Sequence, residues 1–222
     1  MKKLLLTAVA FMMAAVGTNA QFKTGTFSLQ PKLGLGIANI TGIENVQFYG
    51  SNKSSKTITG AGLIGAELEY QIKNNFSLAC ELNYSLQGCA WDDFSNGGME
   101  YKNPRVELGY VKLPIIGNFY LKPGLALKAG LQFGVLTNAH FKCSTEGKLS
   151  GREITTDISI DMNDDFESID VSIPFGVSYE TRKHWVFDAR YQLGLTKINK
   201  NNSKDYKNSV FMITAGYKFK LK

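Results

Sequence analysis

Few residues of this chain have types and spacing that could do chemistry, and the clearest group is acidic. The run Asp161-Met162-Asn163-Asp164-Asp165-Phe166-Glu167 spaces side-chain oxygens as the start of a calcium-binding loop does. Such a loop needs Gly at its sixth position and Glu at its twelfth, where this chain has Phe166 and Ser172. We therefore predict a solvated acidic loop here and no metal site.

A nucleophile and a base stand close together at one place, since His140 and Ser144 are four residues apart. A hydrolytic site needs a nucleophile beside a base that an acid orients. Nothing in the sequence places an acid beside this pair, and the other histidine, His184, follows a predicted short turn. We predict no enzyme activity, no catalytic residue and no cofactor, with an outer-membrane lipid-modifying enzyme as an alternative.

The chain has three cysteines, Cys80, Cys89 and Cys143. Three cysteines and two histidines are too few for most metal centres built on these residues, or for a fold held by disulfides. Cys80 alternates in step with Leu78 and Leu82, so it falls on the apolar face of a predicted strand over 76–87 and is expected to point outward. Cys89 and Cys143 lie near outer strand ends and could form a disulfide bond only if their Cα atoms come within about 7 Å. The sequence leaves that pairing open.

Alternation of apolar and polar residues marks the elements that must position these groups, because a period of two is that of a β-strand. Eight segments alternate: 27–37, 58–70, 76–87, 106–119, 125–135, 171–180, 185–196 and 211–219. At about 10–14 residues each, they are longer than usual soluble strands of about 5–6 residues. A tilted strand needs about 9–11 residues to cross a bilayer. Leu108 and Tyr110 break the alternation of their segment, which predicts a β-bulge near Tyr110.

Short and long connections alternate between these segments. The short ones are 73–75, 122–124 and 181–183, and the long ones are 41–56, 90–104, 139–168 and 199–208. An even strand number with short periplasmic turns and long outer loops is typical of outer-membrane barrels. Within the longest loop, Ile154, Ile158 and Ile160 alternate, so this loop could extend as a hairpin whose edge adds to a partner's sheet.

The two faces of the strands differ in a way that orients them. The polar face is rich in Gly, Ala, Ser, Thr and Gln, which suit the narrow interior of an eight-stranded barrel. The apolar face carries aromatic residues beside the short turns, as at a membrane interface. These residues are Tyr70, Phe76, Phe119, Tyr179, Trp185, Phe187, Tyr217 and Phe219. We predict that the apolar face meets lipid; a soluble lipocalin-like ligand carrier, with the opposite facing, is the alternative.

Charged residues on the polar face are then predicted to point inward. They are Lys32, Glu67, Glu69, Glu81, Lys128, Asp188, Arg190 and Lys218, and also Lys112 if the bulge is present. Buried charges need partners, and so narrow an interior is filled by side chains. We predict a paired network that fills the interior, with a small outer-membrane pore as the alternative.

The N-terminus has the pattern of a secretory signal peptide. Lys2 and Lys3 precede the apolar run 4–16, and Thr18-Asn19-Ala20 forms a small-residue cleavage site. We predict a signal peptide over 1–20, cleavage after Ala20, and one barrel domain over 21–222. Cleavage lowers the formal net charge from +6 to +4, and with no basic stripe this predicts no nucleic-acid partner.

Three features together resemble the PorT-type outer membrane β-barrel proteins, a porin-like family also described as the outer membrane protein beta-barrel domain. They are the signal end Ala20-Gln21, the segment Tyr110-Val111-Lys112-Leu113-Pro114-Ile115-Ile116, and the closing segment Ala215-Gly216-Tyr217-Lys218-Phe219. The chain departs from the family's frequent aromatic end, because Lys220-Leu221-Lys222 follow Phe219. The resemblance implies an outer-membrane barrel and no particular activity.

We therefore expect an all-β protein, an eight-stranded antiparallel up-and-down transmembrane β-barrel of a Gram-negative outer membrane. Its expected role is that of a monomeric structural or interaction barrel presenting outer loops. Its expected partners are outer-membrane lipid, the barrel-assembly machinery during biogenesis, and an envelope or extracellular protein bound through loops 41–56, 90–104, 139–168 and 199–208.

Overall fold

The computed structural model of the protein describes residues 23–43, 55–96, 99–149, 152–200 and 204–221. Within these ranges the chain forms twelve β-strands and one short 3-10 helix, η1 (Asn163–Asp165). No helix in this part of the chain is long and apolar enough to cross a membrane. The predicted signal peptide, its cleavage after Ala20 and most of loop 41–56 lie outside the described residues.

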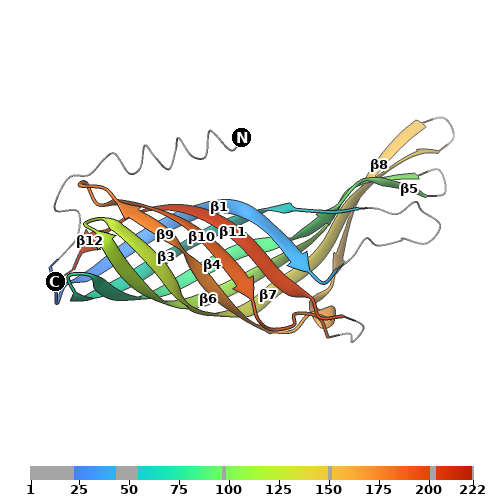
Figure 1. Cartoon of the computed structure of the whole chain (residues 1–222). Helices are drawn as coiled ribbons and strands as arrows, with labels where there is room; N and C mark the ends of the chain where they lie inside the picture. The colour runs from blue at the N-terminus through green and yellow to red at the C-terminus, as the bar shows by residue number, and fades with distance from the viewer. Residues whose placement is uncertain (1–22, 44–54, 97–98, 150–151, 201–203, 222) are drawn as a thin grey trace.

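Eight long strands form a closed antiparallel ring (Figure 1). They are β1 (Phe27–Thr41), β3 (Thr59–Lys73), β4 (Phe76–Trp91), β6 (Met99–Lys122), β7 (Leu125–Leu149), β9 (Ile169–Glu180), β10 (Trp185–Gly194) and β11 (Lys207–Tyr217). Each strand pairs with the next along the chain. β11 pairs back onto β1, with Ile213 opposite Leu35, and closes the ring. The predicted eight-stranded up-and-down barrel is confirmed.

Four further strands extend this ring. β2 (Lys56–Thr57) pairs with β4, β5 (Phe94–Asn96) with β6, and β8 (Arg152–Asp161) with β7, all at the end that carries the long connections. We call this end the outer end. β12 (Phe219–Lys220) pairs with the start of β1 at the opposite end.

The three predicted short turns lie together at the other end of the ring. They join β3 to β4 through 74–75, β6 to β7 through 123–124 and β9 to β10 through 181–184. Gly124 has a φ of 83°, a left-handed conformation that glycine adopts without steric cost. Aromatic residues line this end, as predicted: the rings of Phe27 and Tyr70 are 4.5 Å apart, and those of Trp185 and Tyr217 are 5.4 Å apart.

Side chains in the ring alternate between a buried interior, here called the lumen, and an exposed outer wall. Large apolar residues face outward, with Leu35 77% exposed and Leu82 61% exposed. In β6 this outward apolar band runs from Val111 to Leu121. An eight-stranded ring leaves room inside for little more than side chains, so the small and polar residues occupy the lumen. The predicted facing is confirmed.

The bulge predicted in β6 near Tyr110 lies in the neighbouring strand β7, so the prediction is wrong about the strand. The register of β6 and β7 does shift at Tyr110, but the residue without a partner is Thr137 of β7. In β6, Leu108, Tyr110 and Lys112 are all buried inside without any break in alternation. The prediction assumed that every large apolar side chain faces outward. The side chains of Leu108 and Tyr110 instead lie beyond the outward apolar band and pack inside.

The predictions that 90–104 and 139–168 are loops are wrong in part, because strands continue through both segments. β6 and β7 are 24 and 25 residues long, well beyond the predicted length. Loop 139–168 contains the end of β7 and all of β8, which form the hairpin predicted for this loop, and loop 90–104 contains β5 and the start of β6. Figure 1 shows both hairpins projecting beyond the ring. β5, β6, β7 and β8 thus form a four-stranded sheet, here called the outer sheet.

Candidate functional site

The middle of the lumen is filled by three cations and three carboxylates. They are Lys32 on β1, Glu67 on β3, Glu81 on β4, Lys128 on β7, and Asp188 and Arg190 on β10. Each residue is at most 4% exposed. All six were predicted to point inward, and the structure confirms this.

These six side chains form a closed cycle in which every cation joins two carboxylates. Arg190 contacts both Glu81 oxygens through Nη1 and Nη2 at 3.1 and 3.0 Å, and Nη2 contacts Asp188 Oδ2 at 2.7 Å. Lys128 Nζ lies 3.1 Å from Asp188 and 2.9 Å from Glu67.

Lys32 completes this cycle, because its Nζ lies 3.2 Å from Glu67 and 2.7 Å from Glu81. The group is electroneutral and joins five of the eight ring strands across the lumen. Removal from water costs each charge several kcal/mol, which full pairing offsets. The predicted filling network is therefore present.

A second polar group lies between this cycle and the short turns. Lys218 Nζ is 2.8 Å from Glu69 and 2.9 Å from Glu180. Glu69 also accepts hydrogen bonds from the hydroxyls of Ser77 and Tyr120. His184, in the β9–β10 turn, lies with its Nδ1 2.7 Å from Glu180. This group closes the lumen at the short-turn end.

On the outer side of the cycle, Lys112 is held by neutral groups. Its Nζ donates to the side-chain oxygens of Gln87 at 2.5 Å and Gln192 at 2.8 Å, and lies 5.7 Å from the centre of the Tyr110 ring. Among the described residues no carboxylate lies within 4 Å of it. Lys112 points inward as predicted, although the bulge on which that prediction depended is not in its strand.

An apolar cluster covers the lumen at the outer end, and we call it the plug. It contains Ile40, Cys89, Trp91, Val106, Leu108, Tyr110, Ala139, Phe166 and Ile198. Phe166 and Ile198 come from the two connections that flank β9 and β10, and a bridge between Phe166 and Asn199 holds these connections together.

The predicted acidic loop contributes to this plug. Asn163 accepts a hydrogen bond from the Ala139 N–H at 2.8 Å, and Phe166 is buried in the plug. Asp164 and Asp165 are exposed to solvent, as predicted. In the part of the chain that the structure describes, no cluster of metal-ligating residues occurs.

The structure does not bring together Ser144 and His140, the candidate nucleophile and base for which no activity was predicted. Ser144 Oγ donates to Asp157 at 2.6 Å, and His140 lies opposite Asp161 in the β7–β8 register. Four residues along an extended strand separate His140 and Ser144 by about 13 Å. Cys80 is exposed on the outer wall, as predicted. Cys89 and Cys143 are buried and free, so the disulfide bond that the sequence left open between them does not form.

Two inward carboxylates and the plug were absent from the sequence predictions. Even-numbered residues of the predicted strand 171–180 face inward, and Glu180 is one of them. Asp170 directly precedes this strand and is also even-numbered, so it faces inward as well. Asp170 accepts hydrogen bonds from Asn208 at 3.2 Å and Thr196 at 3.4 Å. Alternation could therefore have found both carboxylates.

The outer sheet has one charged face. Glu107 binds Arg105 at 2.7 Å and Lys142 at 2.6 Å, and Lys102 binds Glu100 at 2.7 Å. Burial raises the pKa of Glu107, but hydrogen bonds and charges from Lys142 and Arg105 outweigh burial and hold that pKa below its usual range.

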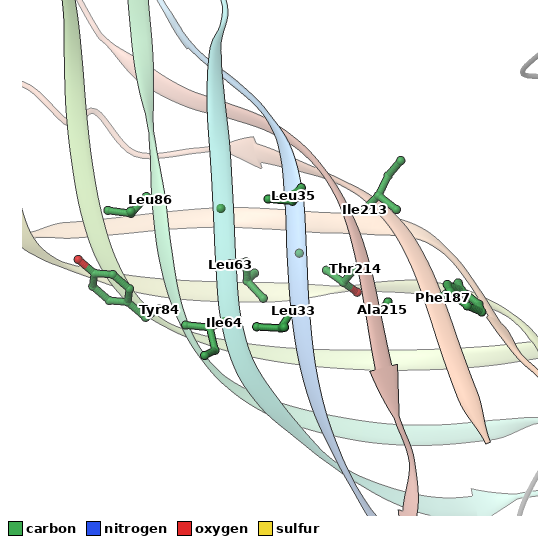
Figure 2. A pocket seen from close by; sticks show the side chains of 12 residues that line it. Leu33, Leu35, Leu63, Ile64, Tyr84, Leu86, Phe187, Ile213, Thr214 and Ala215 are labelled. Carbon is green, nitrogen blue, oxygen red and sulfur yellow. The ribbon is translucent and has the colours of Figure 1, made fainter. Parts of the chain in front are cut away.

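The outer wall of the ring has a shallow groove of about 910 Å³, which Figure 2 shows between β4 and β10. Leu33, Leu35, Ile64 and Ile213 project around it, and a side chain at Gly62 would meet nothing within 4 Å. The lining is almost wholly apolar, so the groove suits hydrocarbon chains.

The sequence matches a family described as "Outer membrane protein beta-barrel domain" over residues 19–200. This match covers well over half of the chain. No curated protein matches the chain significantly.

Several solved structures are similar to this chain at low sequence identity. Ail, the attachment invasion locus protein of Yersinia pestis, in complex with the heparin analogue sucrose octasulfate, is 14% identical, with a TM-score of 0.45 over 88% of this chain and 99% of Ail. Neisserial surface protein A is 15% identical, with a TM-score of 0.43 over 87% and 97%. OprG from Pseudomonas aeruginosa is 11% identical, with a TM-score of 0.42 over 90% and 98%.

Proposed function

The chain belongs to the outer membrane protein beta-barrel domain family, and from this premise we propose that it is a closed, non-conducting anchor for its outer sheet. It is an outer-membrane β-barrel protein, and the soluble lipocalin-like alternative is thereby excluded. Our proposal adds that the barrel has no enzyme activity and that the outer sheet binds an envelope or extracellular protein.

Several finer assignments belong to the same proposal. They are membership of the PorT-type group, cleavage of the signal peptide after Ala20, insertion by the barrel-assembly machinery, contact with outer-membrane lipid, and a monomeric state. The segment Tyr110–Ile116 and the sequence before Gln21 support the first two.

The single observation that carries the proposal is the filled lumen. The ion-pair cycle occupies its middle, the Lys218 group lies on one side, and the plug covers the other. A water-filled pore needs a continuous polar path, and the buried apolar side chains of Leu108 and Ile198 lie across the outer opening. The filled interior supports a structural role over the pore alternative.

We expect the purified protein to give no discrete conductance steps in a planar lipid bilayer, because the lumen is filled along its length. A known open porin, reconstituted in the same way, serves as the positive control. Steps whose ion selectivity changes in Lys112→Glu would contradict the proposal, since only ions that pass through the lumen would sense this residue.

The outer sheet is expected to be dispensable for barrel formation. Deleting 143–158 and joining Lys142 to Ser159 through Asn-Gly removes most of the β7–β8 hairpin and leaves the ring strands paired. We expect this variant to keep a fast-migrating unboiled band on a gel of the outer-membrane fraction. Loss of that band would show that the hairpin is needed for folding.

Partner binding is tested with a photo-cross-linking amino acid at Thr156 in intact cells. The matched control places the same amino acid at Arg182, in a short turn. We expect cross-links to a protein from Thr156 only. Equal cross-linking at both positions, or none at Thr156, would overturn the proposed role of the outer sheet.

A further inference from the structure

The strand β8 has one open edge. It pairs along its whole length with β7, from His140 opposite Asp161 to Leu149 opposite Arg152, and with no other strand that the structure describes. Backbone groups on the far side of β8 therefore lack strand partners over about ten residues. Such an edge readily pairs with another chain, and proteins usually protect it with charges or short length.

One face of the outer sheet beside this edge is apolar. Ile154, Ile158 and Ile160 share one parity of β8, and Ile154 and Ile160 are 44% and 53% exposed. On β7, Cys143 lies opposite Ile158. Farther along the same face, the rings of Phe94 and Tyr101 stack at 4.6 Å.

The opposite face of β8 is acidic. Asp157 and Asp161 lie four residues apart, which is about 13 Å along a strand. Asp164 and Asp165 follow directly, and all four are exposed. Arg152 is the single cationic residue in the sequence of β8. A strand added at this edge would therefore meet isoleucines on one face and the carboxylates of Asp157 and Asp161 on the other.

We propose that the β8 edge accepts one strand of a partner protein in which apolar residues alternate with polar ones and Lys or Arg recurs at every fourth position. Backbone hydrogen bonds supply affinity in such strand addition, and side chains of alternating parity supply specificity. This inference rests on the proposed function, and it names the chemistry of the partner.

A second copy of this chain is the less suitable occupant. Two β8 strands paired edge to edge would bring two Asp157–Asp161 sets onto one face, with no cation from either strand. Like charges on neighbouring strands are destabilising. Charge complementarity therefore favours a basic strand from another protein.

The test uses the full protein in lipid nanodiscs and three synthetic probe peptides. The first has the sequence KVTVKVTVK, the second EVTVEVTVE, and the third has the composition of the first in an order without alternation. We expect the first to bind the wild type by fluorescence anisotropy, more weakly at high salt, and the other two not to bind.

A matched pair of variants separates edge pairing from general attraction. D157K/D161K reverses two charges on β8, whereas D164K/D165K makes the same change in η1. We expect D157K/D161K to weaken KVTVKVTVK binding by at least about tenfold and to gain binding of EVTVEVTVE, and D164K/D165K to change binding less than about twofold. An unboiled gel band confirms that each variant has formed its barrel.

Hydrogen exchange provides the independent measurement, because a bound strand must protect amides of 152–161. Equal loss of binding in both double variants, or binding without slower exchange in β8, would overturn the inference. Concentration-dependent dimers abolished by D157K/D161K would replace the basic strand with a second copy. Cross-links from Thr156 that survive D157K/D161K would overturn this inference while leaving the proposed function intact.

Discussion

Arg190→Ala is expected to destabilise the folded barrel by about 3–5 kcal/mol, the cost of breaking a buried ion pair by removing one partner. Arg190 contacts Glu81 and Asp188 together, and all three side chains are at most 5% exposed. Without the guanidinium, both carboxylates stay buried with fewer partners. Lys32 and Lys128 can each neutralise only part of this charge, since both also serve Glu67.

The measurement is equilibrium unfolding in guanidinium chloride from vesicles, followed by the gel shift between folded and unfolded forms. Arg182→Ala is the matched control, because Arg182 stands exposed in a short turn. If Arg190→Ala and Arg182→Ala unfold at the same denaturant concentration, the cycle contributes nothing to stability and its structural role is refuted.

The cycle also predicts that losses within it are not additive. The double variant Glu81→Gln with Arg190→Met removes one charge of each sign, so it leaves fewer unpaired groups than Arg190→Ala does. We expect the double variant to be the more stable of the two. A double variant less stable than Arg190→Ala would show that the charges act independently.

Leu82→Arg is expected to cost about 2–4 kcal/mol of folding free energy in a bilayer, the cost of a cation at the midplane of a lipid-facing barrel wall. Leu82 is outward-facing, and lies near the middle of the apolar stretch of β4 between Phe76 and Leu86. Leu193 lies on the same wall but nearer the outer end of β10, so Leu193→Arg is expected to cost about 0–1 kcal/mol.

Folded fractions of the two variants in vesicles, measured by gel shift across a denaturant series, test this depth dependence. Leu82→Phe controls for a change of size without charge. Equal costs for Leu82→Arg and Leu193→Arg would show that position along the strand does not correspond to bilayer depth. Unimpaired folding of Leu82→Arg would show that this wall does not face lipid.

The facing of most residues could be predicted because it is a local property. Side chains alternate with a period of two, so a charged residue such as Glu67 or Arg190 points to the same side as the small or polar residues two positions away. Short turns and an even strand number also follow from local signals, at Asn74 and Pro123 for example. The closed ring and the inward charges were therefore accessible from the sequence.

The expectation that large apolar side chains face outward failed beyond the membrane-spanning part of the strands, where water surrounds the outer wall. Leu108 and Tyr110 lie beyond the outward apolar band of β6, which starts at Val111, and they face inward because they pack there into the apolar plug. The change from lipid to water also hid the start of β6, since outside the bilayer residues such as Lys102 and Glu107 are favourable on an outward face. The alternation of apolar and polar residues does not by itself show where along a strand the membrane ends and water begins.

Which side chains meet across the lumen was decided by tertiary structure alone. Alternation places Lys32, Glu67 and Arg190 inside, but their heights depend on the stagger between neighbouring strands, which is set only when β11 closes onto β1. Thr137 has no partner in β6, so the side chains of β7 that follow it face the opposite side from the one that alternation before it would predict. The sequence therefore determined which charges are buried, and the closed ring determined that they form one neutral cycle beneath an apolar plug.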